Sequence, residues 1–517
     1  MRRALLSLCV CLGAYALCCA QSFTVVAQRL EVTSQLDRRV DPELLALLAP
    51  YQAAVDSLRK PLLGFSATPM TAERPESLLS NWVSDALRAH ADSIGRPADL
   101  GLYNMGGIRS NLPQGPITRG DILEMAPFEN RFCLLTLRGN DLLDLFAQIA
   151  HSHGEGISGA QLDISDDGRL LSATVNGEPV RPDGEYTIAT IDYLAGGNDG
   201  LLALKQALRC DVRDELVRDV LMAQVQQQGT IQASIEGRIT VNGQKARTPD
   251  DNALPEGKSL LIVHTNDTHS CVEPLNPLSP DKQKANKAGF LRRAALLNDL
   301  RAEDPDLLLF DCGDMSQGSA YYTLFKGEVE FRLMNAMHYD AATIGNHEFD
   351  FGIDNMASLF ALANFPIVCA NYDFDNTPLD TLVKPYVVIE RQGLRIGVFG
   401  LSPQLEGLVA AENCIGITYL DPIAEANRVA SLLRDQEQCD LVICLSHLGW
   451  EPGLNDDTCD QQLIPQTRGI DIVLGGHSHT YFENPVFLDN LDGVPVPCNQ
   501  MGKNGQWVGT LRLTIPQ

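Results

Sequence analysis

The stretch Gly345-Asn346-His347-Glu348-Phe349-Asp350 places an amide, an imidazole and two carboxyl groups within six residues. Four other short motifs have a similar composition: His264-Thr265-Asn266-Asp267-Thr268-His269, Asp311-Cys312-Gly313-Asp314, Ser446-His447-Leu448-Gly449 and Gly475-Gly476-His477-Ser478-His479. Each motif follows an apolar run typical of a buried strand, at residues 260–263, 307–310, 341–344, 441–445 and 470–474. Because sites in α/β sheets form at the carboxyl ends of strands, the five motifs are predicted to meet.

Seven side chains in these motifs are candidate metal ligands: Asp267, His269, Asp314, Asn346, His447, His477 and His479. If Asp314 bridges, each of two ions receives four protein ligands and keeps room for water and substrate. This mixture of ligands suits Zn, Mn, Fe or Co better than Ca. Two ions about 3.5–4 Å apart can clamp a phosphoryl oxygen and generate hydroxide. We interpret His347 as the group that stabilises charge or protonates the leaving oxygen, with Asp350 orienting its ring.

Residues 259–517 resemble the calcineurin-like metallophosphoesterases and, within them, the 5′-nucleotidase family, because all five motifs occur in the family's order. A single Asp-x-His pair would be better explained by hydrogen-bonded loop histidines, but five ordered motifs would not. The resemblance implies the same seven metal ligands and makes His347 and Asp350 the catalytic pair. It also implies an α/β fold in which this half is a four-layer αββα sandwich.

The first half contains a second group of motifs. Residues 100–103 read as a short strand, and Asn104-Met105-Gly106-Gly107-Ile108-Arg109 follows it. Paired glycines let a backbone approach a ligand closely, and an arginine presents a planar fork suited to phosphate. This signal is weak alone, since Gly-Gly is usually a turn. Further along lie Pro127-Phe128-Glu129-Asn130 and a glycine-rich stretch with Tyr193 and Asp199.

Together these motifs resemble the substrate-binding domain of the same family, a separate α/β domain, over about residues 22–240. The resemblance implies that Asn104, Gly107 and Arg109 contact nucleotide and phosphate, that Phe128 and Tyr193 sandwich the base, and that Asp199 binds ribose hydroxyls. Stacking on two rings tolerates any base, and a carboxylate can accept bonds from a diol. The alternative for both rings is core packing. Glu129 replaces the family's usual glycine, and Arg74 is a weak candidate for a further phosphate-binding arginine.

Residues 1–20 are predicted to be a signal peptide, with Arg2 and Arg3 before an apolar run. A lipoprotein anchor at Cys18 or Cys19 has less support, because Tyr15-Ala16-Leu17 is a poor lipobox. No later stretch is long and apolar enough to span a membrane, so the mature protein is expected to be periplasmic or secreted. The net charge of −26 argues against nucleic-acid polymers as partners, although a merely solvated acidic surface explains it equally well.

The expected domains are the signal peptide at 1–20, a nucleotide-binding domain at 21–240, a turn-rich linker at 241–258 and the metallophosphoesterase domain at 259–517. This order reverses the usual family chain. The leading interpretation is a 5′-nucleotidase that hydrolyses nucleoside 5′-monophosphates with two divalent metal ions. UDP-sugar or 2′,3′-cyclic-nucleotide hydrolysis is the alternative within the enzyme class. A nucleotide-binding surface protein without catalysis is the alternative outside it, but none of the seven ligands is missing. The preferred base, the metal and the oligomeric state stay open.

Overall fold

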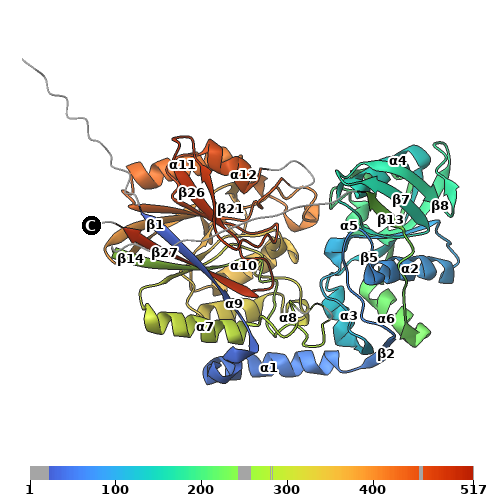
Figure 1. Cartoon of the computed structure of the whole chain (residues 1–517), viewed down its shortest axis with the longest axis horizontal. Coiled ribbons are helices and arrows are strands. Elements are labelled where there is room, and N and C mark those ends of the chain that lie inside the picture. The colour runs from blue at the N-terminus through green and yellow to red at the C-terminus, as the bar shows by residue number, and fades with distance from the viewer. Residues whose placement is uncertain (1–22, 243–257, 280, 282, 453–457, 516–517) are drawn as a thin grey trace, which may run out of the picture.

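The computed structural model describes residues 23–242, 258–279, 281, 283–452 and 458–515. The signal peptide expected at residues 1–20 lies outside the described residues, as does the part of the expected linker at 243–257. Within the described residues, no helix has both the length and the apolar character needed to cross a bilayer. The chain folds into a larger and a smaller lobe, and α1 (Pro42–Arg59) runs along one side of both (Figure 1).

The larger lobe contains two large sheets and a small one, in which β18 (Tyr372–Asp373) pairs with β22 (Thr418–Tyr419). The first has the strand order β1-β27-β14-β15-β16-β17-β19, and the second has the order β20-β21-β23-β24-β26-β25. The strands of the first sheet are β1 (Thr24–Glu31), β14 (Lys258–Thr265), β15 (Leu308–Asp311), β16 (Ala341–Ala342), β17 (Ile367–Val368), β19 (Val383–Lys384) and β27 (Trp507–Ile515). Those of the second are β20 (Tyr386–Arg391), β21 (Leu394–Leu401), β23 (Leu441–Ser446), β24 (Ile472–Leu474), β25 (Val486–Asp489) and β26 (Pro495–Asn499).

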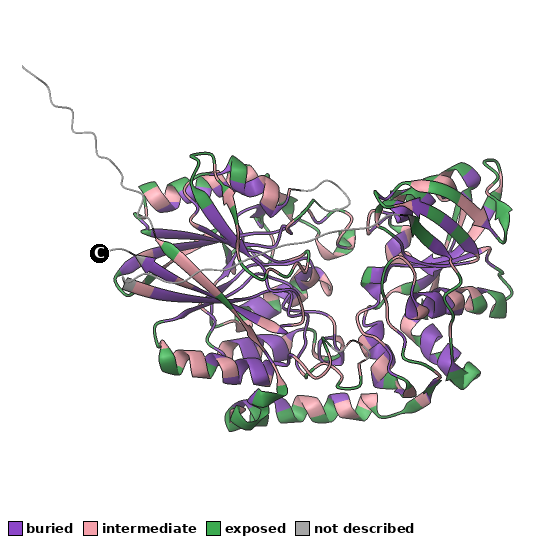
Figure 2. Ribbon diagram, viewed as in Figure 1, coloured by how far each residue is buried: buried purple, intermediate pink, exposed green. Residues whose placement is uncertain are grey.

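Three apolar layers hold these sheets and their helices together. The layer between the sheets includes Ile262 and Phe310 from one sheet and Ile443 from the other. Helices α7 (Phe290–Glu303), α8 (Ala320–Phe325), α9 (Glu328–Ala336) and α10 (Gly352–Leu362) cover the first sheet, and α11 (Pro422–Asp435) and α12 (Asp460–Leu463) cover the second. The strands are mostly buried, whereas the helices expose their outer faces (Figure 2). The predicted α/β fold with a four-layer αββα sandwich is confirmed.

The smaller lobe has its own core, which draws on residues between Met70 and Ile239. Its main sheet has the order β11-β5-β10-β3-β6. The bounds are β3 (Leu100–Tyr103), β5 (Arg131–Arg138), β6 (Gly156–Ser158), β10 (Glu185–Ile191) and β11 (Arg209–Leu216), with helices α2 (Leu78–Ser93), α3 (Arg119–Met125), α4 (Gly139–His151), α5 (Asp192–Ala195) and α6 (Val217–Gln228). Two small sheets complete it: β2 (Leu62–Ser66), β4 (Gly115–Thr118) and β12 (Thr230–Ile231), and β7 (Ala160–Ser165), β8 (Leu170–Val175), β9 (Glu178–Pro179) and β13 (Ile239–Asn242).

The first described elements of the chain belong to the larger lobe. Strand β1 pairs antiparallel with β27 over its whole length. Helix α1 begins after the N-cap Asp41 and buries Leu44, Leu48 and Val55 in the core beneath the first sheet. The sequence predicts a nucleotide-binding domain at 21–240, but the structure packs residues 24–59 on the other lobe. The physical reason is that the partner of β1 lies at the far end of the sequence, where no local pattern reveals it.

Candidate active site

The five sequence motifs come together at the carboxyl ends of strands from both sheets. Asp267 and His269 follow β14, Asp314 follows β15 and Asn346 follows β16, whereas His447 follows β23, and His477 and His479 follow β24. The ligand atoms of Asp267, His269 and His479 lie within 4.8 Å of one another, as do those of Asp314, His447 and His477. A third group within the same limit joins His269 and Asp314 to His347. Two adjoining clusters therefore form one polar centre between the sheets.

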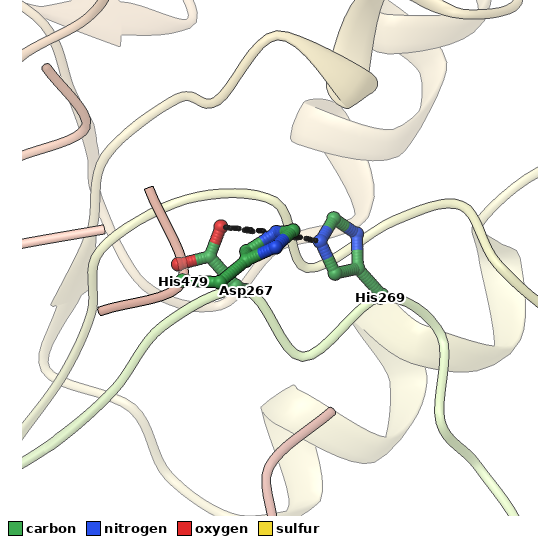
Figure 3. Close-up of side chains that lie close together, drawn as sticks. All are labelled: Asp267, His269 and His479. Carbon is green, nitrogen blue, oxygen red and sulfur yellow. Dashed lines mark hydrogen bonds and ion pairs between the residues drawn. The ribbon is translucent and has the colours of Figure 1, made fainter. Parts of the chain in front are cut away.

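Figure 3 shows the first of these clusters. His479 Nε2 lies 3.5 Å from Asp267 Oδ1, and it is 2.8 Å from His269 Nε2. Asp267 and His269 come from the loop after β14, and His479 comes from a loop more than 200 positions further along the sequence. The three side chains thus converge only because β14 and β24 belong to sheets that face each other.

The backbone at these ligands is unusual. Five of the seven adopt a positive φ: Asp267 (49°), His269 (45°), Asp314 (54°), His477 (70°) and His479 (54°). Non-glycine residues rarely occupy this region, and such strain concentrates at functional sites. Backbone hydrogen bonds hold the conformation, since Asp267 N donates to Gly313 O at 3.0 Å and His269 N donates to Asp314 O at 2.9 Å.

The donor atoms fit divalent cations. His447 Nδ1 donates to the carbonyl oxygen of Cys312 at 2.6 Å, which leaves Nε2 buried and without a hydrogen bond, 3.3 Å from Asp314 Oδ2. Asn346 Oδ1 is likewise buried without a partner. Asp267 is fully buried, and burial raises its pKa to about 7. Bare imidazole nitrogens and buried carboxylates are the ligands that transition metals prefer, and a backbone carbonyl that fixes the histidine tautomer is typical of such sites.

Glu348 holds two of the ligand loops together, a role that the sequence did not predict. Its side chain is 1% exposed and accepts N–H bonds from Gly345 at 2.7 Å, from Asp314 at 3.1 Å and from Ser316 at 3.1 Å. These bonds fix the loop after β15 against the loop after β16. The sequence offered one signal for this role: Glu348 is an acidic residue between His347 and Phe349 that is not needed as a metal ligand.

His347 lies beside the clusters with one carboxylate partner. Its Nδ1 is 3.1 Å from Asp350 Oδ2, and its Nε2 faces the smaller lobe, 3.2 Å from Arg109 Nη2. Burial lowers the pKa of His347, but the carboxylates of Asp350 and Asp314 outweigh burial and raise it. A protonated imidazole in this position can donate a hydrogen bond or a proton.

Arg109 extends from the smaller lobe to the candidate metal-ligand clusters of the larger lobe. Its Nη2 donates to Gln317 Oε1 at 2.9 Å, and its guanidinium lies 5.6 Å from the centre of the Phe128 ring. The Phe128 ring centre is in turn 6.0 Å from that of His347. A cation and an aromatic ring from one lobe therefore stand next to the clusters of the other. Gln317 carried no sequence signal, because its contact with Arg109 exists only between the lobes.

Tyr193 and Asp199 form the other end of the site. Asp199 accepts hydrogen bonds from the Tyr193 hydroxyl at 2.8 Å and from Asn104 Nδ2 at 2.5 Å. A loop of the larger lobe reaches both residues: Asp199 N donates to Gly407 O at 3.3 Å, and the Tyr193 hydroxyl lies 3.4 Å from Leu408 O. This loop carries none of the predicted metal ligands, so the sequence did not mark it as part of the site.

One cavity of about 1030 Å³ runs between the two ends. Its lining includes all six predicted substrate residues, Asn104, Gly107, Arg109, Phe128, Tyr193 and Asp199, together with Asp314, Asn346, His347, Asp350, His477 and His479. Arg74 is placed elsewhere. It donates to Gly154 O at 2.7 Å and forms an ion pair with Glu155.

Comparison with known families gives two matches. A model of the 5′-nucleotidase C-terminal domain matches residues 56–206, and a model of calcineurin-like phosphoesterases matches residues 260–481. The chain belongs to the 5′-nucleotidase family. Within this family it has its two domains in reversed order, since the domain described as C-terminal occupies the first half. The match to the 5′-nucleotidase C-terminal domain begins only at residue 56, which agrees with the packing of β1 and α1 on the larger lobe.

Individual relatives cover parts of this 5′-nucleotidase family member. It is 24% identical to the trifunctional nucleotide phosphoesterase protein YfkN of Bacillus subtilis, over 82% of this chain and 35% of that protein. Human 5′-nucleotidase is 30% identical over 50% of this chain and 47% of its own length. The chain thus spans half or less of each of these relatives. A solved 5′-nucleotidase precursor from Thermus thermophilus is 30% identical, with a TM-score of 0.44 over 49% of this chain and 51% of that one.

Proposed function

We propose that this chain is an exported 5′-nucleotidase that uses two divalent metal ions to hydrolyse nucleoside 5′-monophosphates. One observation carries the proposal: four of the seven candidate ligands of the larger lobe line the same cavity as the Arg109–Phe128 pair of the smaller lobe. These four are Asp314, Asn346, His477 and His479. A mononucleotide has an anionic end that suits cations and a flat end that suits aromatic rings. A cavity of about 1030 Å³ is at the upper end of the range that small ligands occupy.

Seven side chains would hold the ions. Asp267, His269 and His479 would serve one position and His447 and His477 the other, with Asp314 between them. The buried, unpaired Oδ1 of Asn346 would supply the seventh ligand atom. Bound there, two divalent ions would polarise the phosphoryl group and lower the pKa of a water molecule, which supplies a nucleophile at neutral pH.

His347 and Arg109 would both bind the phosphate ester, and His347 would protonate its leaving oxygen. When His347 is protonated, its Nε2 and the Arg109 Nη2 are both donors, yet they lie 3.2 Å apart. Two donors in this position favour an anion that accepts from both, and a phosphate oxygen meets that need. His347 Nε2 would then give its proton to the leaving oxygen, while Asp350 keeps the ring oriented through Nδ1.

The smaller lobe would hold the nucleoside. Phe128 and Tyr193 both line the cavity and would stack against the base, which tolerates different bases. Asp199 already accepts bonds from Tyr193 and Asn104, but each carboxylate oxygen has a second lone pair for a ribose hydroxyl. Gln317 would keep the Arg109 fork aimed at the phosphate.

A panel of substrates tests the proposal with the purified full-length protein. Phosphate release would be measured with AMP, UMP, UDP-glucose, 2′,3′-cyclic AMP and p-nitrophenyl phosphate, each with added Zn²⁺, Mn²⁺ or Co²⁺. We expect the highest kcat/KM for a 5′-monophosphate. A higher value for UDP-glucose or the cyclic nucleotide would favour the alternative hydrolase activities. Tight nucleotide binding without turnover, in protein that contains its metal, would indicate a nucleotide-binding protein.

A further inference from the structure

The loop from Asn104 to Arg109 is held in place by a buried side chain outside the cavity. The backbone N–H of Met105 donates to the carboxylate oxygen Glu155 Oε2. Glu155 lies between α4 and β6, is 2% exposed and does not line the cavity. Glu155 therefore contacts, from outside the cavity, the loop that carries the predicted nucleotide-binding residues.

The other side of the Glu155 carboxylate is neutralised. Its Oε1 pairs with Arg74 Nη2 and accepts from the Ser152 hydroxyl at 3.2 Å. Arg74 is itself fixed by its bond to Gly154 O. A buried carboxylate is costly unless it is paired and hydrogen-bonded, so a carboxylate here needs Arg74. Arg74 was a candidate phosphate ligand in the sequence, but the structure gives it this counter-ion role.

The loop has little freedom to absorb a shift at Met105. Asn104, directly before it, bonds Asp199, and Arg109 N donates to Met125 O at 2.9 Å at the other end of the loop. Gly107 is so close to Asn104 that a Cβ there would lie 2.7 Å from Asn104 Oδ1. Movement of Met105 would therefore displace Asn104 and the start of the segment that aims Arg109 at His347.

We propose that Glu155 is a positioning residue whose hydrogen bond to Met105 N–H sets the affinity of the site for nucleotides, with Arg74 as its counter-ion. The proposal rests on the proposed function, because the affinity concerns the nucleotide. It assigns a role in the site to two side chains that touch neither the metal ligands nor the cavity.

Two double variants isolate the hydrogen bond from the charge. Arg74→Met with Glu155→Gln removes both charges but keeps an acceptor oxygen for Met105 N–H. Arg74→Met with Glu155→Met removes the charges and the acceptor, with a side chain of similar length. A control, Glu236→Gln, alters another Arg–Glu pair of the same lobe, because Glu236 Oε2 lies 2.9 Å from Arg238 Nη2. Each full-length protein would be assayed for kcat and KM with AMP and with p-nitrophenyl phosphate, and for metal content.

We expect the Gln double variant and the Glu236 control to keep the KM of the wild type for AMP within about threefold. The Met double variant should raise this KM about tenfold or more, as expected for a lost hydrogen bond to a buried N–H. Its kcat for p-nitrophenyl phosphate and its metal content should not change. Amide hydrogen exchange at Met105 should be faster in the Met variant than in the Gln variant.

Equal KM values for AMP in the two double variants would overturn the proposal, as would equal exchange rates at Met105. A merely structural role predicts a lower melting temperature in the Met variant without a change in KM. If the wild type hydrolyses no nucleotide, the proposed function fails. The exchange rates at Met105 would then still show whether Glu155 holds the loop.

Discussion

Thr24 lies opposite Thr514 in an antiparallel strand pair, so the first and last described strands are neighbours in one sheet. The ladder continues from this pair to Glu31, opposite Trp507. Helix α1 then crosses the larger lobe and leads into β2 of the smaller one (Figure 1). The smaller lobe is therefore joined to the larger one on both sides in the sequence, through α1 and through the segment before β14.

The first prediction concerns a cut between the lobes. Cleavage at a protease site inserted between Thr248 and Asp251 would divide the chain into two pieces. The first piece ends at the cut, and the second begins after it. We expect the two pieces to stay associated, because β1 and α1 of the first piece remain paired and packed on the second. The cut protein should elute as one species in gel filtration and retain AMP hydrolysis. Removing residues 23–59 from the first piece is the matched control, which should abolish association. Separation of the intact pieces at micromolar concentration would contradict this.

The second prediction concerns the ions. Chelation should abolish hydrolysis, and a divalent transition metal should restore it. Asp314→Ala should be the most damaging ligand change, because Asp314 lies 3.3 Å from His447 Nε2 and 3.9 Å from His269 Nε2, within reach of both clusters. Metal analysis of this variant should show a deficit in both ions. Full activity of metal-free protein would exclude a metal-dependent reaction.

The third prediction concerns His347. His347→Asn should lower kcat by about 10²–10⁴-fold, the usual contribution of general acid–base catalysis. Metal content should stay near that of the wild type, because all of the proposed metal ligands are untouched. Asp350→Asn should give a smaller loss, since it removes the carboxylate that orients the ring and raises its pKa but leaves the imidazole in place. Loss of an ion from the His347 variant would make His347 a ligand instead.

The fourth prediction concerns the base site. Phe128→Ala and Tyr193→Ala should each raise KM for AMP, at a cost of about 1–3 kcal/mol per lost stack. Tyr193→Phe is the informative control, because it keeps the ring but loses the hydroxyl that bonds Asp199. A small aryl phosphate should be less affected than AMP. If both alanine variants handle AMP like the wild type, the rings serve core packing.

The fifth prediction concerns stability at acidic pH. His264 is fully buried on β14, and burial lowers its pKa to about 3. The folded state therefore keeps the ring neutral, whereas the unfolded chain binds a proton near pH 6.5. The stability that the neutral ring contributes should be lost as the pH falls from about 6.5 towards 3. This one group changes the free energy of unfolding by at most about 1.4 kcal/mol per pH unit.

Denaturant unfolding at pH 7, 6, 5 and 4 would measure this effect against His264→Gln. The variant should lose stability less steeply below pH 6, because glutamine takes up no proton. It should also be less stable than the wild type at pH 7, since Asn499 Nδ2 lies 3.0 Å from His264 Nε2. Parallel pH profiles for the two proteins would show that His264 does not control the acid response.

The sequence by itself determined much of the metal centre. An apolar run followed at once by aspartate, asparagine or histidine specifies a strand end and a ligand together, and that pairing is local. The same holds for Asn104 to Arg109, where the glycines and the arginine lie in one short segment after β3. These patterns sufficed to select side chains that the structure brings together at one site, whereas the αββα sandwich was implied by the resemblance of the ordered motifs to a known family.

Only the tertiary structure decided which distant segments support those motifs. The pairing of β1 with β27, the bonds from Glu348 to two neighbouring loops and the contact of Gln317 with Arg109 all join residues whose local sequence is ordinary. Glu155 is the sharpest example, because a glutamate after a helix reads as a solvated turn until the fold buries it under Met105. Local sequence encodes burial and turns, whereas the partner of a buried polar group is set by which segments the whole chain brings into contact.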